Sequence, residues 1–544
     1  MADLVGVAGL TFAAFDRIWL IGSKTAEVIS DYREFDKDSI ELSNDITCEN
    51  NRTKTLQCLL FEPSTAYSGR SLFEQFDENV QMQIQIRLEK LLNIINEGSE
   101  LLNRQQIEQP MAQSEQVADG HEKINSENLA PTRISPLIKK KSRSLLRLRW
   151  SLWDKRRLES IVKDFAKENE KVNAQVQLMC HATSIGVNLT HLDRLKTNEH
   201  SRKLGFDLPA QLQLNITGMQ TSPTSLQLKD ERLFRDLTAC SKIESKFAIL
   251  DYLERPLLVE FRSYAPEKTE PVPLEDRTKD RVEMLAHLLL QRKDSVFHTL
   301  SCEGWVLDAQ ENQVAFLFAI PDGMKGMPFS LLRLYELQAL RPSLGERLRL
   351  AKSLACSICE LQLVKWVHKS FRSENILFFP RAQGAQEASI EKDRVGISQP
   401  WVMGFEFSRP ELDFSSGRPD KDIARDVYRH PERQQRPQRP FSKIHDIYGL
   451  GVVLLEIGLW RPVLSLERDG FRRVNDPFTI QSYLVKKAEK SLPLQVGEHY
   501  KQVVVRCLTG RFDVENDNRE ELKLQQAFRA QVLDVLDRAA ESIG

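Results

Sequence analysis

The sequence has no excess of either charge and no apolar run long enough to cross a membrane. Its 76 basic and 77 acidic residues leave a net charge of −1, so no global field attracts nucleic acid or lipid. The uncharged stretch 4–15 is bounded by Asp3 and Asp16, whereas a spanning helix needs about 20 apolar residues. An acid at position 3 is also untypical of a secretory leader. We therefore expect a globular, cytoplasmic chain without a leader, a spanning helix or a nucleic-acid-binding motif.

Cysteine is sparse, and its spacing gives no sign of a metal site or a disulfide framework. The eight cysteines are scattered, and only Cys356 and Cys359 lie close together. A zinc site would need a second pair or a histidine cluster, so we interpret this pair as one face of a helix and expect no metal. Scattered thiols are typical of proteins kept reduced inside the cell.

Helical patterns dominate the first 205 residues, where two apolar stripes recur at helical spacing. The stripes consist of Ile84, Leu88, Leu91, Leu92 and Ile95, and of Leu158, Ile161, Val162 and Phe165. Gly98 lies near the expected end of the first helix. The polar residues 104–136 predict a flexible loop, and residues 206–232 have the composition of a linker. We expect an α-helical bundle over 1–205 and a second domain over 233–544.

The second domain begins with strand patterns and continues with long helices. Strands are predicted by the runs FAILDYL and PLLVEFRSY, and a hairpin with a polar turn by GWVLDAQENQVAFLFAIP. Long helices are predicted over SLGERLRLAKSLACSICELQLV and DIYGLGVVLLEIGLW. This order predicts an α+β fold with a small sheet and a larger helical lobe.

One segment resembles the catalytic loop of protein kinases: residues 366–379, WVHKSFRSENILFF. His368 and Asn375 stand at the spacing of the kinase His and Asn. Ser370 stands at the position of the catalytic Asp, and Arg372 at that of the following Lys. Asn375 is either a metal ligand or a residue that braces the loop, and we favour bracing. The same residues also fit a solvated loop in an unrelated helical protein.

A second segment, WVMGFEFSR, resembles the kinase stretch that carries the metal-binding Asp-Phe-Gly. Phe405 keeps its place, whereas Gly404 replaces the Asp and Glu406 replaces the Gly. Arg262 in VEFR stands where kinases carry the phosphate-holding Lys, and no glycine-rich loop precedes its strand. Glu283, in the next predicted helix, is either the acidic partner of that position or a surface residue.

Residues that support the kinase fold have counterparts in Glu432 of YRHPE, Asp446 of DIYGLG and Arg511 of CLTGRF. In the family, this glutamate pairs with this arginine. The resemblance covers about 235–540 and implies a bilobal kinase-like domain without its base and its metal ligand. Because kinase catalysis depends on both groups, and loss of the base alone costs about 10² to 10⁴ in rate, we expect no intact catalytic residue. Binding of ATP with Mg²⁺ through Arg262 and Asn375 stays open.

The start of the chain is similar to the HeLo domain, a prion-inhibition and propagation domain of fungal cell-death and incompatibility proteins of the HET-S type. The similarity rests on a short apolar helix that leads into a long one, VGVAGLTFAAFDRIWLIGSKTAEVISDYREFDKDSIELSNDI, and on WSLWDKRRLESIVKDFAKENEKV. It implies that the first helix is a core helix at rest and inserts into membranes after self-association. The candidate insertion residues are Leu4, Val5, Val7, Leu10, Phe12 and Phe15.

A basic cluster lies after the polar loop. Residues 133–149 carry seven basic side chains and no acidic one, and each charge attracts anionic lipid by about 1 kcal/mol near the surface. Phosphorylation of Ser142 or Ser144 would weaken that contact. The cluster equally fits a nuclear-import signal or a solvated loop.

Together, the two resemblances predict a cell-death effector in which a pseudokinase domain restrains a membrane-targeting helical domain. We expect self-association and membrane association on activation by an unidentified protein or ligand. One alternative is an atypical kinase that uses Glu406, Asp413 or Asp420 to hold the metal. Another is an adaptor in which both domains are docking surfaces.

Overall fold

The chain forms two compact units, each made from two pieces of sequence. Unit 1 comprises residues 1–180 and 197–206, and unit 2 comprises residues 181–196 and 207–544. The computed structural model describes residues 2–31, 37–107, 152–218, 225–240, 242, 246–265, 270–324, 326–337, 340–380, 396–405, 423–434, 440–467, 469–474 and 476–543. An N-terminal helical region is followed by a mixed α+β region with small antiparallel sheets, which confirms the expected fold class at this level.

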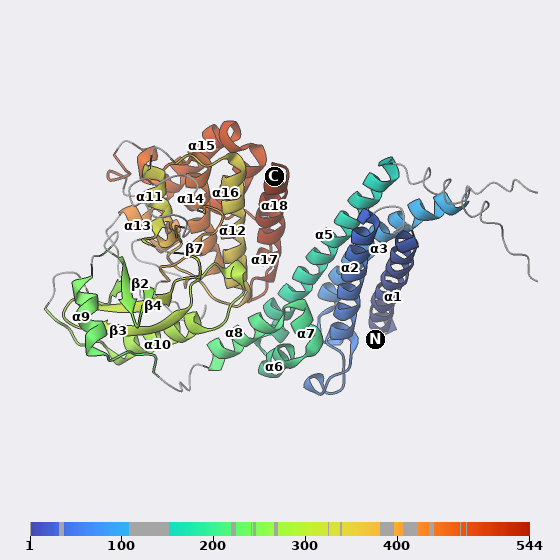
Figure 1. Ribbon diagram of the computed structural model, residues 1–544, viewed down its shortest axis with the longest axis horizontal. Coiled ribbons are helices and arrows are strands. Elements are labelled where there is room, and N and C mark those ends of the chain that lie inside the picture. The colour runs from blue at the N-terminus through green and yellow to red at the C-terminus, as the bar shows by residue number, and fades with distance from the viewer. Residues whose placement is uncertain are drawn as a thin grey trace, which may run out of the picture. The chain divides into compact units, whose positions relative to one another are not determined.

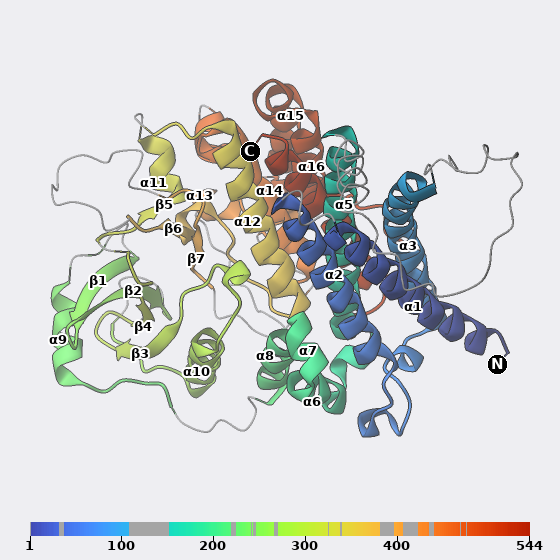
Figure 2. The same cartoon turned by 45° about the vertical axis from the view of Figure 1, so that its right-hand side comes forward.

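Unit 1 is a set of long helices that pack side by side (Figures 1 and 2). They are α1 (Ala2–Asp31), α2 (Lys37–Phe61), α3 (Glu78–Ile107), α5 (Leu152–Ala182, all but its last two residues) and the short α7 (Glu199–Leu204). Short 3₁₀ turns lie at Thr65–Tyr67 and Phe73–Gln75. α1 packs against both α2 and α3, and α7 packs against α2.

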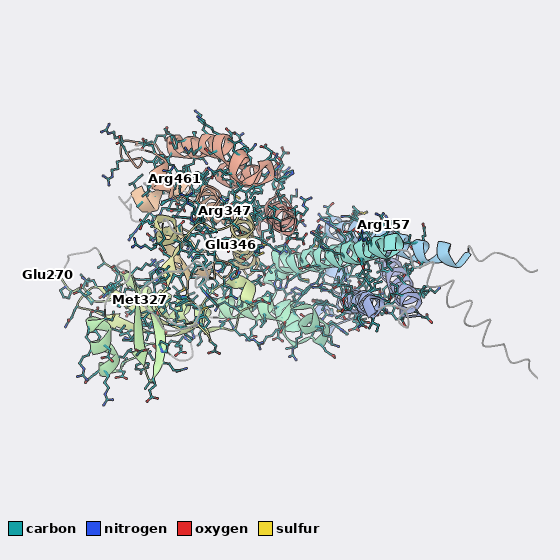
Figure 3. The ribbon with its side chains drawn as sticks, turned by 45° about the horizontal axis from the view of Figure 1, so that its top comes forward. Arg157, Glu270, Met327, Glu346, Arg347 and Arg461 are labelled. Atoms are coloured by element: carbon teal, nitrogen blue, oxygen red, sulfur yellow. The ribbon has the colours of Figure 1, made fainter. Side chains whose placement is uncertain are left out.

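Both predicted apolar stripes face the core of unit 1. All their members are buried except Leu92, which is partly exposed. The expected helix end at Gly98 is wrong, because α3 continues to Ile107. A Cβ on Gly98 would lie 3.2 Å from Cγ2 of Ile161, so this glycine allows α3 and α5 to approach closely. Arg157 of α5, labelled in Figure 3, forms an ion pair with Glu97 of α3.

The apolar start of the chain is part of one 30-residue helix, α1, and not of a short helix that ends before a second one. Asp16 does not interrupt it: its carboxylate is half exposed and accepts a hydrogen bond from Gln57 Nε2 at 2.9 Å. Among the candidate insertion residues, Phe15 is buried, Val7 is partly exposed, and Leu10 and Phe12 are 61% and 43% exposed. The side chains of Leu4 and Val5 lie outside the described residues. None of the described helices has the length and apolarity that membrane crossing requires.

Unit 2 begins with a four-stranded antiparallel sheet of order β1-β2-β4-β3. The strands are β1 (Phe247–Tyr252), β2 (Arg255–Ser263), β3 (Cys302–Asp308) and β4 (Gln313–Ala319). Both predicted strands and the predicted hairpin are confirmed, with Asp308 paired to Gln313 beside the turn. The helix α10 (Asp276–Leu290) covers one face of this sheet, and α9 (Glu231–Ala239) covers the other (Figures 1 and 2).

The rest of unit 2 is mostly helical around a small sheet of order β5-β6-β7. The strands are β5 (Phe329–Ser330), β6 (Ile376–Phe378) and β7 (Trp401–Val402). The helices are α6 (Leu189–Thr197), α8 (Asp207–Gly218), α11 (Leu331–Glu336), α12 (Leu344–Leu363), α13 (Ile423–Asp426), α14 (Lys443–Leu459), α15 (Pro477–Val496), α16 (Glu498–Thr509), α17 (Leu522–Phe528) and α18 (Asp534–Glu541). α12 and α14 confirm the two predicted long helices. Arg347 of α12, labelled in Figure 3, donates to the Gly458 carbonyl of α14 at 2.9 Å.

The stretch 206–232, expected as a linker, contains ordered structure. α8 occupies Asp207–Gly218, where Gln213 donates to the Leu363 carbonyl at 3.0 Å. Further on, the Leu228 amide donates to the Trp305 carbonyl at 2.8 Å, so this segment lies along β3. Of the expected loop 104–136, residues 104–107 end α3 and the remainder lies outside the described residues, as does the basic cluster 133–149 with Ser142 and Ser144.

Candidate functional site

The residues compared with a kinase active site converge in unit 2, between the four-stranded sheet and the segments that flank β6 and β7. Two further residues, Lys246 and Glu260, contact them: Lys246 Nζ donates to Asn375 Oδ1 at 2.7 Å, and the Gly404 amide donates to Glu260 Oε2 at 3.3 Å. We call Lys246, Glu260, Arg262, Asn375 and Gly404 the polar cluster.

Glu260 and Arg262 form a buried ion pair on β2. They are two residues apart, so both side chains point to the same face of the sheet. Arg262 Nε donates to Glu260 Oε1 at 3.0 Å, and the guanidinium packs over the Phe316 ring at 4.8 Å from its centroid. Burial alone would raise the pKa of the Glu260 carboxyl, but the charges of Arg262 and Lys246 outweigh it and lower that pKa. Nη1 of Arg262 is buried and has no hydrogen-bond partner among the described residues.

Asn375 uses its whole side-chain amide to hold neighbouring groups. Its Nδ2 donates to the Ser370 carbonyl at 2.8 Å, and its Oδ1 accepts from Lys246. Burial lowers the pKa of Lys246 to about 8, and the Glu260 carboxylate, 3.5 Å away, opposes that shift. A metal ion at Asn375 Oδ1 would have to displace this ammonium, so the contacts are those of a residue that braces the loop.

Gly404, which the sequence comparison aligned with the metal-binding Asp of kinases, has no room for a side chain. A Cβ there would lie 2.2 Å from Cγ of Asn375, far inside van der Waals contact. Its φ of +79° also lies in the left-handed region, which favours glycine. The backbone and the Asn375 amide therefore occupy the volume that a metal-binding carboxylate would need.

His368 and Asp446 fix the loop that precedes Asn375. The Asp446 carboxylate accepts from the His368 amide at 2.6 Å and from the Lys369 amide at 2.9 Å. The His368 ring accepts from the Ser370 amide through Nδ1, so its proton is on Nε2, which donates to the Met403 carbonyl at 3.0 Å. Burial lowers the pKa of His368 to about 3. The ring also packs against Phe405, with centroids 4.3 Å apart, so this histidine is a neutral structural residue.

The other residues that were compared with kinase positions make contacts outside the polar cluster. Arg372 is buried, with Nε 2.6 Å from Glu374 Oε1. Glu283 of α10 accepts from the Leu226 amide at 3.0 Å, so it holds the segment beside β3. Glu406 lies outside the described residues, as do Asp413 and Asp420.

The two residues compared with the structural ion pair of the kinase fold are Glu432 and Arg511. Oε2 of Glu432 lies 3.8 Å from Nε2 of His445. Arg511 is exposed and follows the glycine that ends α16. Pairing of Glu432 with Arg511 stays a prediction.

Lys246 and Glu260 were not predicted as site residues. The available signal was a carboxylate inside the apolar run PLLVEFRSY, two residues before Arg262, because such a residue faces the same side of a strand. For Lys246 there was no comparable signal, since it lies outside every motif and reaches Asn375 only through the folded chain.

The charges of the polar cluster do not fit a nucleotide-bound Mg²⁺. Mg²⁺ prefers carboxylate, water and phosphate oxygens in octahedral geometry. Here the buried carboxylate of Glu260 is already paired with Arg262 and close to Lys246, and Arg372 adds a further positive charge nearby. The cluster can instead attract an anion, because Arg262 keeps an unpaired buried nitrogen.

Residues 262–541, just over half of the chain, match the sequence family described as Domain of unknown function (DUF7580). The chain belongs to this family. A comparison with curated proteins finds no match. The DUF7580 region begins at Arg262 and contains Asn375 and Gly404, whereas Lys246 and Glu260 precede it.

Proposed function

We propose that the DUF7580 region is a non-catalytic, kinase-like signalling module, and that unit 1 is a HeLo-like effector that acts on membranes once the module releases it. The observation that carries the first half is the overlap at Gly404. The metal-binding position has no side chain, and the Asn375 amide, held by Lys246, fills the space where one would lie. A site arranged in this way supports a regulatory role rather than phosphoryl transfer.

The second half is supported by the surface of α1. Leu10, Phe12, Trp19 and Leu20 are each between 41% and 61% exposed. Clusters of exposed apolar side chains are typical of surfaces that contact a membrane or a partner. Self-association would let several copies share the cost of burying Asp16 and Arg17 in lipid.

The catalytic question is tested by the melting temperature of the full chain with ATP, with and without Mg²⁺ or Mn²⁺. We expect no metal-dependent rise, because the polar cluster offers the metal no free carboxylate. A rise that requires metal and disappears in Asn375→Ala would favour the atypical kinase. Transfer of radiolabelled phosphate, abolished by Glu406→Gln, would then establish it.

The membrane question is tested with a fragment of residues 1–206, which contains all of unit 1, and vesicles that include anionic lipid. We expect the fragment to release a trapped dye, and the double variant Leu10→Asp with Phe12→Asp to lose that activity. The matched control is Ile86→Asp on α3, which is 57% exposed and should keep it. Self-association without dye release would support the adaptor instead.

A further inference from the structure

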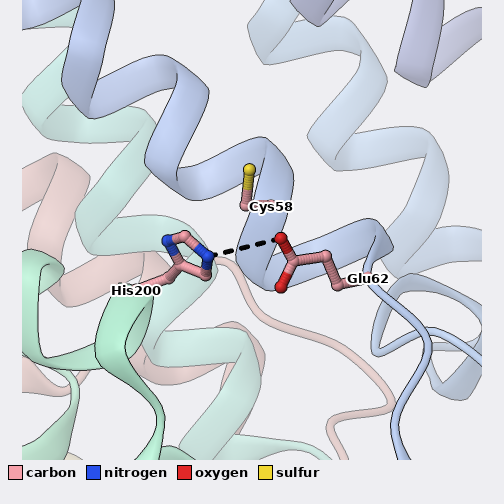
Figure 4. Close-up of side chains that lie close together, drawn as sticks. All are labelled: Cys58, Glu62 and His200. Atoms are coloured by element: carbon pink, nitrogen blue, oxygen red, sulfur yellow. Dashed lines mark ion pairs between the residues drawn. The ribbon is translucent and has the colours of Figure 1, made fainter.

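Three side chains with metal-binding atoms meet in unit 1, at the end of α2 and the start of α7 (Figure 4). They are Cys58, Glu62 and His200, whose ligand atoms all lie within 4.8 Å of one another. Nε2 of His200 lies 3.3 Å from Oε1 of Glu62, and Figure 4 shows the Cys58 sulfur beside this pair.

The backbone presents all three side chains in a fixed arrangement. The Glu62 amide donates to the Cys58 carbonyl at 3.0 Å, so the helical turn extends past α2 and places both side chains on one face. His200 lies in the first turn of α7, whose N-terminus is capped by Asn198 through a 3.0 Å bond to the Ser201 amide.

The distances are close to those of a bound zinc ion. With Zn–S near 2.3 Å and Zn–N or Zn–O near 2.0–2.1 Å, tetrahedral ligand atoms lie about 3.5 Å apart. The His200–Glu62 separation already has this value to within a few tenths of an ångström. The Cys58 sulfur lies within 4.8 Å of both other ligand atoms, so it needs to approach each of them by about 1.3 Å at most.

The donor set selects the metal. A thiolate, an imidazole and one carboxylate suit Zn²⁺, whereas Mg²⁺ and Ca²⁺ prefer oxygen ligands alone. Burial raises the pKa of the Cys58 thiol, and the Glu62 carboxylate raises it further. A zinc ion binds the thiolate, so its binding displaces the Cys58 proton, and the Glu62 carboxylate balances part of the metal's charge.

A second group, His430, Glu432 and His445, is less suited to a metal. Nδ1 of His430 accepts from the Glu432 amide, and Nδ1 of His445 accepts from the Ser442 amide at 2.9 Å. Both rings therefore carry their proton on Nε2, the nitrogen that would have to bind the metal. Metal binding there would break two helix-end hydrogen bonds.

We propose that Cys58, Glu62 and His200 bind one Zn²⁺ ion, which fastens α7 to α2 and leaves the fourth position to water. Binding replaces the Cys58 proton by the metal and releases that proton to solvent, with no change in oxidation state. Because the metal joins helices that are far apart in sequence, it binds the folded form of unit 1 and not the unfolded chain, and it therefore stabilises the fold.

The test is zinc binding by the full chain, measured as metal content after dialysis and by calorimetric titration. We expect one Zn²⁺ per chain, and a loss of affinity of at least about tenfold in Cys58→Ser and in His200→Gln, since even residues behind the ligands contribute 10- to 100-fold. The matched control Cys48→Ser, an exposed cysteine on the same helix, should bind as the parent does.

Cobalt gives a second measurement that does not depend on stability. Co²⁺ bound to the parent chain should show the charge-transfer absorption of a thiolate ligand, and Cys58→Ser should lose it while Cys48→Ser keeps it. The proposal is overturned if the parent binds no zinc, or if Cys58→Ser binds zinc as tightly as the parent and its far-ultraviolet circular dichroism is unchanged.

Discussion

At the scale of single residues, the packing of the polar cluster depends on the absence of a side chain at Gly404. Because its φ is positive and Asn375 lies where its Cβ would be, no side chain can be introduced there without moving Asn375. A carboxylate side chain introduced at position 404 would therefore have to displace the Asn375 amide.

Replacement of Gly404 by Ala should lower the free energy of unfolding by about 2–5 kcal/mol, from the positive φ and the overlap with Asn375. The measurement is urea denaturation of the full chain. In Asn375→Ala, which removes the overlapping atoms, the same replacement should cost about 1–3 kcal/mol less. Strict additivity of the two substitutions would contradict this account of the overlap.

Glu456 should make stability depend on pH. Burial raises its pKa to about 7, and hydrogen bonds from Ser373, Val463 and Tyr428 oppose the shift. Between pH 4.5 and 7, the folded protein holds a proton that the unfolded chain has released, so this residue's contribution to stability falls as pH rises through that window and is constant above it.

The size of this effect is about 3 kcal/mol, from 1.36 kcal/mol per pKa unit. Urea denaturation at about pH 5 and about pH 7.5 measures the free energy of unfolding at each pH. This free energy should fall more between the two pH values in the parent than in Glu456→Gln, whose amide does not titrate. In that variant a hydroxyl of Ser373 or Tyr428 must turn to accept from the amide. Equal losses in the two proteins would refute the assignment.

At the scale of elements, α1 and α2 are joined by a hydrogen-bonded contact that a glycine makes possible. Asn50 of α2 donates to the Trp19 carbonyl at 2.9 Å and to Ser23 Oγ at 3.0 Å on α1. A Cβ on Gly22 would lie 2.6 Å from Oδ1 of Asn50. The close approach of these helices therefore depends on position 22.

Replacement of glycine by alanine should have opposite effects on stability at two positions of α1. Gly9 has nothing within 4 Å of its Cβ direction, so Gly9→Ala should stabilise the chain by about 0.5–1 kcal/mol through helix propensity. Gly22→Ala should destabilise it, because Asn50 must give up its bonds to α1. Thermal denaturation measures both signs, and hydrogen exchange of the α1 amides should increase only in Gly22→Ala.

An element could be predicted from the sequence where the local pattern of apolar residues determines its structure. The β3–β4 hairpin and the core stripes of α3 and α5 followed from periodicity, because burial of alternate or helically spaced residues is visible in sequence. The end of the first helix was missed because Asp16 and Arg17 face solvent, where charges do not interrupt a helix. Gly98 was misjudged because its role is contact with Ile161, which only tertiary packing reveals.

The candidate site was also predictable only in part, because some of its residues lie in recognisable sequence patterns and others are brought together only by the fold. Asn375, Ser370 and Gly404 were singled out by the spacing of a sequence pattern, and the structure places Asn375 in contact with the Ser370 carbonyl and beside Gly404. Lys246 and Glu260 were missed because their roles come from strand pairing and from the return of a distant loop. Likewise, no spacing rule connects Cys58 with His200, since the fold alone brings α7 to α2.

At the scale of the whole molecule, unit 1 is discontinuous in sequence. The segment 197–206 returns to it after residues 181–196 have entered unit 2. Within unit 1, Asn173 donates to the Leu204 carbonyl at 3.4 Å, and Gln177 donates to the Gly205 carbonyl at 3.0 Å. A boundary drawn after α5 would therefore remove part of the bundle.

A fragment of residues 1–206 should melt at a higher temperature than one of residues 1–180, because only the longer one contains α7 and its contacts with α2 and α5. Differential scanning calorimetry measures this difference. As a control, Asn173→Ala should lower the melting temperature of the longer fragment and leave that of the shorter one nearly unchanged. Equal melting temperatures for the two fragments would show that α7 contributes nothing to unit 1.

The late position of α7 also affects synthesis of the protein. A ribosome adds about 5–20 residues per second, so on the order of ten seconds separates the end of α3 from the end of α7. During that interval the nascent bundle is unfinished while its first, largely apolar helix has already left the exit tunnel. Slow translation would lengthen the time for which newly made chains expose this apolar surface.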